Sequence, residues 1–136
     1  SMKNGNVYVD SEDNVEKHLQ QLKELLKDPK CKLDILPRKK DEAEDDPYTT
    51  ENTMQMLNYD SGDVRRELLT LSTDDYIENM KDDRHPNTPD FRVFGKTLNG
   101  FQIYIKEKIR STKGVFCVSF HRARYHLKDR PYKSEN

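Results

Sequence analysis

Apolar residues in the first part of the chain recur at the spacing of an amphipathic helix. Between Val15 and Leu26 they stand three or four residues apart, which keeps them on one face of a helix. Asp13 or Asn14 can cap the start of this helix with a side-chain oxygen. The pattern therefore predicts a helix over residues 14–27.

The middle of the chain repeats the helical period with interruptions. We expect a short helical segment over residues 53–57 and a longer helix over residues 60–72, where Asp60 or Ser61 can act as the cap. Thr73 offers a second capping signal. The apolar positions that follow it predict one or two further helical turns.

Three other stretches of the first half lack a helical period. Weak alternation over residues 31–36 predicts a short strand, which Pro37 ends. Residues 39–51 carry dense charge and almost no apolar side chains, so we expect a mobile loop or a surface insertion. Residues 1–12 are polar apart from a short apolar patch at 7–9, and they predict a flexible segment, either a frayed end or an edge strand.

After Pro89 the period changes from helical to two, which is typical of strands. The expected strands cover residues 91–97, 101–110 and 115–122. Asn99-Gly100 predicts a tight hairpin between the first two, because both residues tolerate positive φ, and Lys113-Gly114 closes the second hairpin. The fold class is therefore α+β. We expect one domain over residues 13–136, with a small antiparallel sheet of three or more strands and the N-terminal helices packed on one face.

Charge is distributed unevenly along the chain. The 136 residues are 32% hydrophobic and 36% charged, with a net charge of −1. Residues 91–136 nevertheless hold 11 Lys and Arg against 3 Asp and Glu, a net of +8, while residues 1–60 and 61–90 are net −5 and −4. A basic module of this kind favours a polyanionic partner, since neutralised phosphates release counterions. The alternative is a solvated sheet face balanced by acidic helices.

Targeting segments and cysteines bear on where the protein works and on whether it holds a disulfide or a metal. No apolar run approaches the roughly 18 residues that cross a bilayer, and the N-terminus lacks the apolar stretch of a signal peptide, so we expect a cytoplasmic protein. Ser1 before Met2 is typical of a residue left by tag removal. Cys31 and Cys117 are too far apart for a metal-type pair and are expected to be reduced thiols.

Alternation places polar residues of two neighbouring strands on one face of the sheet. In the third strand, Phe116, Val118 and Phe120 form the apolar set, which leaves Cys117, Ser119 and His121 on the other face. If the apolar sets face the helices, then Tyr104, Lys106 and His121 share one open surface. We expect Arg92 of the first strand to join them.

This residue set suits cleavage of RNA without a metal ion. His121 can act as acid or base near neutral pH, Tyr104 can bind the phosphate or relay a proton, and Lys106 and Arg92 can neutralise developing charge. The products would carry a 2′,3′-cyclic phosphate. Further RNA contacts are expected from Arg38, Lys96, Arg122 and Arg124. Each residue also has a structural alternative, because strand His, Tyr and Lys residues more often serve packing or solubility.

Several short motifs in the right order resemble one protein family. The chain carries LTLSTDDY at residues 69–76, RVFGKTLNGFQIYIK at 92–106, VFCVSFHRARYHLKDRPYK at 115–133 and the corner PRKK at 37–40. Together these segments resemble the MqsR-like family of type II toxins. The resemblance implies a RelE-like fold, mRNA interferase activity and a cognate antitoxin.

The resemblance also covers three residues at or near the candidate site. Tyr104 matches a tyrosine of the family's active strand. His121 stands where the best-known branch has a lysine, and Glu78 stands where that branch has another basic residue. These are the two departures from the family pattern that fall at the candidate site.

The sequence thus leads to one main hypothesis and two alternatives. The main hypothesis is a toxin that cleaves mRNA, free or on the ribosome, without a metal or other cofactor and under the control of an antitoxin. A non-catalytic module that binds nucleic acid or an acidic protein through the same face is the first alternative. The second is a basic face that serves only as the docking surface for an acidic antitoxin segment.

Overall fold

The computed structural model describes residues 6–135, which form a six-stranded mixed sheet and three α-helices. The strands are β1 (Val7–Tyr8), β2 (Lys32–Ile35), β3 (Tyr76–Met80), β4 (Phe91–Leu98), β5 (Phe101–Ser111) and β6 (Gly114–Arg122). Their order across the sheet is β1-β3-β4-β5-β6-β2. The α+β class is confirmed. The sheet is larger than the small antiparallel sheet that the sequence predicts, because β3 and β1 extend it beyond β4. It is mixed because β2 pairs in parallel with β6.

Each helix has a side-chain cap at its start, and for the third helix it is the predicted Asp60. The helices are α1 (Glu12–Lys27), α2 (Thr50–Leu57) and α3 (Ser61–Leu69), followed by the single 3₁₀ turn η2 (Thr73–Asp75). Asp60 caps α3 through a reciprocal pair of hydrogen bonds with Asp63. Ser11 caps α1, so this helix starts two residues before the predicted one.

The hairpin between β4 and β5 forms at the turn residues that the sequence predicts. Asn99 and Gly100 have φ values of 52° and 83°, the left-handed conformation that a tight two-residue turn requires. This turn joins β4 to β5, and β6 completes the meander. Val7–Tyr8 pairs with β3, which makes it an edge strand, whereas residues 1–5 of the predicted flexible segment lie outside the described residues.

The predicted helical turns after Thr73 are wrong. The capping signal produces only η2, and Tyr76–Met80 is the extended strand β3 between β1 and β4. A register shift between Tyr76 and Glu78 breaks the alternation of this strand. Four of its five residues are buried, so the local sequence has no period of two to indicate a strand.

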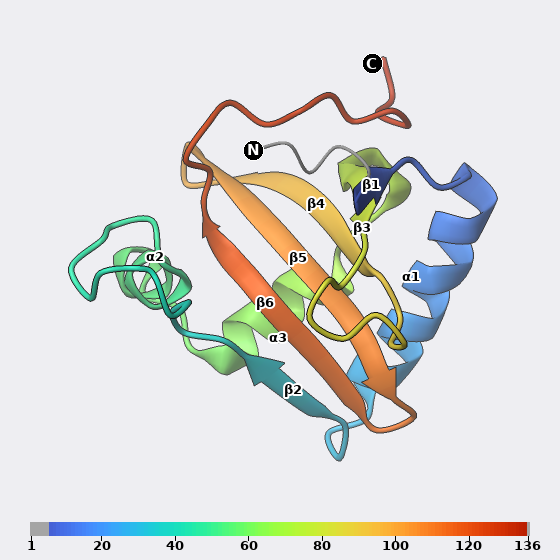
Figure 1. Ribbon diagram of the computed structural model, residues 1–136, viewed down its shortest axis with the longest axis horizontal. Helices are drawn as coiled ribbons and strands as arrows, with labels where there is room; N and C mark the ends of the chain where they lie inside the picture. Colours follow the sequence, from blue (N-terminus) through green and yellow to red (C-terminus); the bar gives the residue numbers. More distant parts are fainter. Residues whose placement is uncertain (1–5, 136) are drawn as a thin grey trace.

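Helices α1 and α3 lie on one face of the sheet, behind the strands in Figure 1. The core between them is apolar and includes Leu22, Leu68, Phe94, Ile105 and Phe120. Helix α2 lies beside the end of β6, where its threonine hydroxyls Thr50 Oγ1 and Thr53 Oγ1 accept hydrogen bonds from the backbone N–H groups of Phe120 and Arg122. The described part of the chain holds no helix long and apolar enough to cross a membrane.

A bulge in β6 changes which residues face the helices. Lys106 pairs with Ser119, but Glu107 pairs with Cys117, so Val118 is an extra residue. Cys117 therefore lies in the core, and Phe116 lies on the opposite face against Phe91. The predicted apolar set is wrong for these two residues. Beyond the bulge, Phe120 and His121 have the predicted orientations. Cys31 and Cys117 are free, buried thiols, as expected.

Two segments partly cover the face of the sheet that the helices leave open. The loop at residues 81–90 passes in front of β5 in Figure 1, where Asp82 and Thr88 bind the Lys108 ammonium. Residues 123–135, here called the C-terminal segment, cross the other end of the sheet. Leu127 of this segment packs over Gly95. These two segments bound the open face on which the candidate site lies.

Candidate functional site

Tyr104 and His121 are direct partners across β5 and β6 and point to the same open face. Their rings stack with centroids 5.4 Å apart and an angle of 18° between the planes. The next pair on this face is Lys106 with Ser119. The expectation that Tyr104, Lys106 and His121 gather on one surface is therefore met by the geometry of the sheet.

A second lysine enters the site from the charged loop between β2 and α2. Lys39 reaches across to β6, where its Nζ donates a hydrogen bond of 3.0 Å to Ser119 Oγ. The loop is held in place by bonds of its own: Lys39 N donates to Glu42 Oε1, and Asn52 Nδ2 donates to the carbonyls of Glu44 and Asp46. The loop at 39–51 is irregular as far as Thr49, and it forms one wall of the site.

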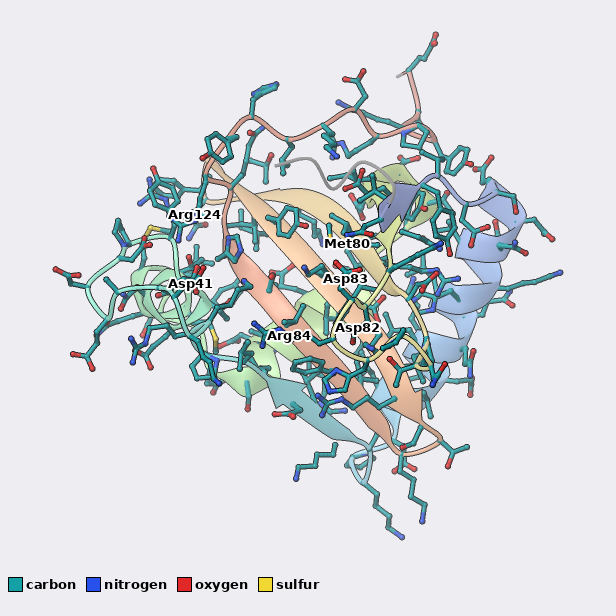
Figure 2. All side chains as sticks on the ribbon, in the orientation of Figure 1. Asp41, Met80, Asp82, Asp83, Arg84 and Arg124 are labelled. Carbon is teal, nitrogen blue, oxygen red and sulfur yellow. The ribbon has the colours of Figure 1, made fainter. Side chains whose placement is uncertain are left out.

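These residues line a polar pocket of about 490 Å³, here called the cationic pocket after Lys39, Lys106 and Arg124, although three carboxylates line it too. Its lining residues are Lys39, Asp41, Glu42, Asp46, Tyr104, Lys106, Ser119, His121 and Arg124. In Figure 2, Asp41 and Arg124 lie on the α2 side of the strands, and Met80 and Asp82 lie on the β3 side. Of these four residues, Asp41 and Arg124 line the cationic pocket, together with Tyr104 of β5 and His121 of β6.

The hydrogen bonding of His121 leaves one ring nitrogen available. Nδ1 lies 2.8 Å from the carbonyl oxygen of Arg122, so Nδ1 carries a hydrogen and donates it. Nε2 then keeps its lone pair in the neutral ring. Burial lowers the pKa of His121, and the bond to Arg122 opposes this effect only in part. His121 is thus a neutral base at pH 7 with Nε2 as its accepting atom.

The two lysines are easier to deprotonate than exposed lysines. Burial lowers the pKa of Lys106 to about 8, and the positive charge of Lys39 acts in the same direction. The pKa of Lys39 is also lowered, mainly by burial. Burial together with the negative charge of Glu78 raises the pKa of Tyr104 to about 12, so its hydroxyl stays protonated. The site therefore combines a neutral imidazole, a phenol that donates, and two ammonium groups.

Carboxylates of the charged loop hold Arg124 at the rim. Arg124 Nη2 lies 2.9 Å from Glu42 Oε2 and 2.6 Å from Asp46 Oδ2. These bonds lower the pKa of Asp46 and raise that of Arg124. The arginine is partly neutralised by the chain itself, so its charge is only partly free for a ligand.

A second pocket of about 300 Å³, here called the apolar pocket, adjoins the first. Its lining residues are Ile77, Glu78, Met80, Tyr104, His121, Ala123, Arg124, Tyr125, His126, Leu127 and Lys128. Tyr104, His121 and Arg124 line both pockets. The stacked Tyr104–His121 pair therefore separates a charged compartment from a mainly apolar one.

Two predicted site residues lie on the other face of the sheet. Arg92 faces α1, where Nη1 lies 3.1 Å from His18 Nδ1 and Nη2 lies 3.3 Å from Asp10 Oδ2. Lys96 faces α3 and binds Glu67 Oε1 at 3.2 Å. The prediction that Arg92 joins the open face is wrong, and Lys96, which was expected to contact RNA, does not lie on that face either. The register decides the face: Arg92 pairs with Glu107 and Lys96 with Ile103, which both point toward the helices.

The three remaining arginines differ in their distance from the pockets. Arg124 lines both pockets, as expected for a rim residue. Arg38 precedes the pocket residue Lys39 and donates from Nη1 to the carbonyl of Glu42. Arg122 packs its guanidinium on the rings of Tyr48 and Phe101, at 4.9 and 4.8 Å from their centroids. Its charge is thus held beside α2.

Lys39 is a site residue that the sequence pattern did not indicate. The only signal for it was its place in the PRKK corner, in which Arg38 was the predicted RNA contact. Ser119 was placed on the correct face but had no role until Lys39 provided its partner. Glu42 and Asp46 were assigned to solvent, and they instead line the cationic pocket.

Comparisons with known proteins leave the family open. No protein-family model matches the chain, and neither curated proteins nor solved structures give a match. Within residues 6–135, no group of three or more His, Cys, Asp or Glu is arranged to hold a metal ion. The MqsR-like resemblance and the RelE-like fold remain predictions from the sequence.

Proposed function

We propose that this protein is the toxin of a type II toxin–antitoxin system and cleaves mRNA at the cationic pocket. The observation that supports this most directly is the common pocket of Tyr104, Lys106 and His121, with Lys39 added from the charged loop. A base, a proton donor and fixed positive charge are what RNA cleavage by its own 2′-hydroxyl requires.

In this proposal His121 is the general base. Its Nε2 accepts the proton of the ribose 2′-hydroxyl as the 2′-oxygen attacks phosphorus. The Arg122 carbonyl fixes the ring by accepting from Nδ1, and the stacked ring of Tyr104 limits its rotation. A base whose pKa lies below the working pH is already in its reactive form.

Lys106 is the general acid, and its neighbours stabilise the transition state. The bond from phosphorus to the 5′-oxygen breaks, and the Lys106 ammonium gives that oxygen a proton. A pKa of about 8 keeps this group protonated at pH 7 while making it a stronger acid than a free lysine. Lys39, held by Ser119, and the Tyr104 hydroxyl then face the charged phosphate oxygens. The products carry a 2′,3′-cyclic phosphate and a 5′-hydroxyl.

We further propose where the reaction takes place and which partner blocks it. The basic C-terminal third of the chain favours a polyanion such as mRNA, free or on the ribosome in the cytoplasm. The MqsR-like motifs support a cognate antitoxin as the partner that blocks this activity. The open face, with Tyr104 and His121 at its floor, is the surface that such a partner would cover.

The test is cleavage of single-stranded RNA, and of mRNA on translating ribosomes, in the presence of a metal chelator. We expect products with cyclic phosphate ends from the wild-type protein. RNA methylated at the 2′-oxygens should stay intact. We expect His121→Ala and Lys106→Met to lose about 100-fold or more in rate, in line with the usual contribution of an acid or base. His85→Ala is the matched control, because His85 lies exposed in the loop at 81–90.

Other outcomes would favour the alternatives. RNA binding without cleavage of free or ribosome-bound RNA would support the non-catalytic binding module and overturn the enzymatic proposal. Tight complex formation with a cognate antitoxin, and no effect on RNA, would support a docking surface alone. Growth arrest on expression that is lost in the His121→Ala variant would support the toxin, provided that thermal unfolding shows the variant to be folded.

A further inference from the structure

The apolar pocket has walls that suit a flat, unsaturated ring. It lies between β3 and the C-terminal segment, and its apolar lining comes from Ile77, Met80, Ala123 and Leu127. The faces of Tyr104 and His121 form the boundary with the cationic pocket. Aromatic rings beside aliphatic side chains are the usual surface on which single-stranded nucleic acids stack a base.

Together the two pockets match the two chemical parts of a nucleotide, a charged phosphate and a flat base. In one compartment Glu42 and Asp46 are paired with Arg124, which leaves Lys39 and Lys106 for a negatively charged group, and hydrocarbon lines most of the other compartment. A ligand with a charged group next to a flat apolar one can fill both. In a nucleotide the phosphate and the base are attached to the same sugar, so one unit can reach both compartments. A phosphate alone would leave the apolar pocket unused.

Tyr125 provides a second stacking surface at the mouth of this pocket. Its side chain lines the pocket and yet is 85% exposed, the most exposed large hydrophobic residue of the described chain. Such an exposed ring contributes little to the core. It can close over a base that enters the pocket, with the Tyr104–His121 pair on the other side.

Glu78 gives the pocket a preference among bases. It is the one carboxylate among the residues that line the apolar pocket, and it is 7% exposed. Lys128 Nζ lies 3.0 and 3.3 Å from its two oxygens, but the Lys128 side chain is 66% exposed and can turn away. A carboxylate accepts hydrogen bonds from exocyclic amino groups and repels carbonyl oxygens.

We propose that the apolar pocket binds one unpaired base of the substrate RNA, stacked between Tyr125 and the Tyr104–His121 pair, and that Glu78 selects amino-bearing bases over uracil. This inference rests on the proposed function for its substrate class. It adds a base-binding subsite to the phosphate site of the cationic pocket and assigns Tyr125 and Glu78 to substrate recognition.

The first test compares ligands on the intact protein by calorimetry at one salt concentration. We expect cytidine 3′-monophosphate to bind about tenfold or more tightly than inorganic phosphate, since stacking of a base contributes roughly that much. Tyr125→Ala should remove most of this difference, and Tyr125→Phe should keep it. Equal binding of cytidine 3′-monophosphate and phosphate to the wild-type protein would overturn the base subsite.

The second test addresses the choice of base. We expect cytidine 3′-monophosphate to bind severalfold more tightly than uridine 3′-monophosphate, and Glu78→Gln to reduce this ratio, because an amide both donates and accepts. Loss of the Glu78 charge should strengthen binding of every phosphate-bearing ligand, because this charge acts on Tyr104 and Lys106. The readout is therefore the ratio of the two nucleotide affinities and not either affinity alone. A ratio that does not change in this variant would show that Glu78 does not select the base.

The two proposals fail in different ways. If the protein cleaves RNA, while nucleotides bind no better than phosphate and Tyr125→Ala cleaves at the wild-type rate, the base subsite is wrong and the ribonuclease stands. If nucleotides bind as expected and no RNA is cleaved, the activity is wrong and the pocket stands as a nucleotide-binding site.

Discussion

The ring of Tyr104 lies stacked on the imidazole of His121, with 5.4 Å between the centroids, at the junction of a cationic and an apolar pocket. This relationship removes one face of the imidazole from water. It leaves Nε2 free, because Nδ1 is bound to the Arg122 carbonyl. The same pair thus sets the protonation state of the proposed base and forms a wall of the proposed base subsite.

The pH dependence of RNA cleavage should be bell-shaped. Burial lowers the pKa of His121 below its ordinary value of 6.5, so activity should rise with pH through that lowered value as the base becomes neutral. Activity should fall above about 8, where Lys106 loses its proton. The measurement is kcat/KM for a short RNA from pH 5 to 10. Lys106→Arg should lose the acid step and much of the rate, because arginine stays protonated and does not release its proton, and its residual activity should lack the falling limb. A falling limb that persists in this variant would contradict the role of Lys106.

Substitution of Gly95 should displace the C-terminal segment. A Cβ atom at this position would meet Leu127 Cδ1 at 2.6 Å, closer than real contacts allow. We expect Gly95→Ala to lower the free energy of unfolding by about 1 kcal/mol, the low end of the usual cost of overpacking, because the clashing atom is the end of the Leu127 side chain. The measurement is chemical denaturation. Combining Gly95→Ala with Leu127→Ala should cost less than the two single changes added together. Additive costs would show that the two side chains do not compete for the same space.

His18 should be important for stability but not for the chemistry of the site. It connects a partly buried guanidinium and a fully buried carboxyl group on the helix side of the sheet: Nδ1 accepts from Arg92 at 3.1 Å, and Nε2 lies 2.5 Å from Glu107 Oε2. We expect His18→Ala to lower the free energy of unfolding by about 3 kcal/mol, because Glu107 would stay buried without its partner. His85→Ala, at an exposed loop position, should change it by less than about 0.5 kcal/mol. The measurement is urea denaturation of both variants. Equal stabilities would contradict the contribution of His18.

Neutralising two carboxylates of the charged loop should strengthen RNA binding. Glu42 and Asp46 hold Arg124 and add negative charge to the cationic pocket. We expect Glu42→Gln combined with Asp46→Asn to increase the affinity for single-stranded RNA severalfold and to steepen its dependence on salt, because Arg124 becomes free to bind phosphate. The measurement is fluorescence anisotropy at several salt concentrations.

A matched control lies in the same loop. Glu44→Gln combined with Asp45→Asn removes the same charge from two exposed positions that do not line the cationic pocket. If this control strengthens binding as much as the Glu42 and Asp46 variant does, then the effect comes from net charge and not from the release of Arg124.

Elements that depend on neighbouring residues could be predicted from the sequence. Helix α1 follows from the spacing of Val15 to Leu26, and the β4–β5 hairpin follows from Asn99-Gly100. The shared face of Tyr104, Lys106 and His121 follows from alternation. These features need only a period and a turn type, and both are written in consecutive residues.

Features that depend on pairing between distant segments could not be predicted in this way. Strand β3 is extended because it lies between β1 and β4, although its sequence follows a cap signal that resembles a helix start. A bulge at Val118 moves Cys117 into the core, and an extra residue of this kind has no local signal. The wrong placement of Arg92 has the same cause, because the residue that it pairs with decides its face.

The sequence alone determined the α+β class, the central meander and the open face with its tyrosine, lysine and histidine. Only the tertiary structure decided that Lys39 joins them, that Arg92 and Lys96 do not, and that the C-terminal segment encloses an apolar pocket beside the charged one. The reason is physical. Local periodicity fixes the direction of each side chain within its strand, whereas a pocket forms from segments far apart in the chain, whose contacts depend on how the whole sheet packs.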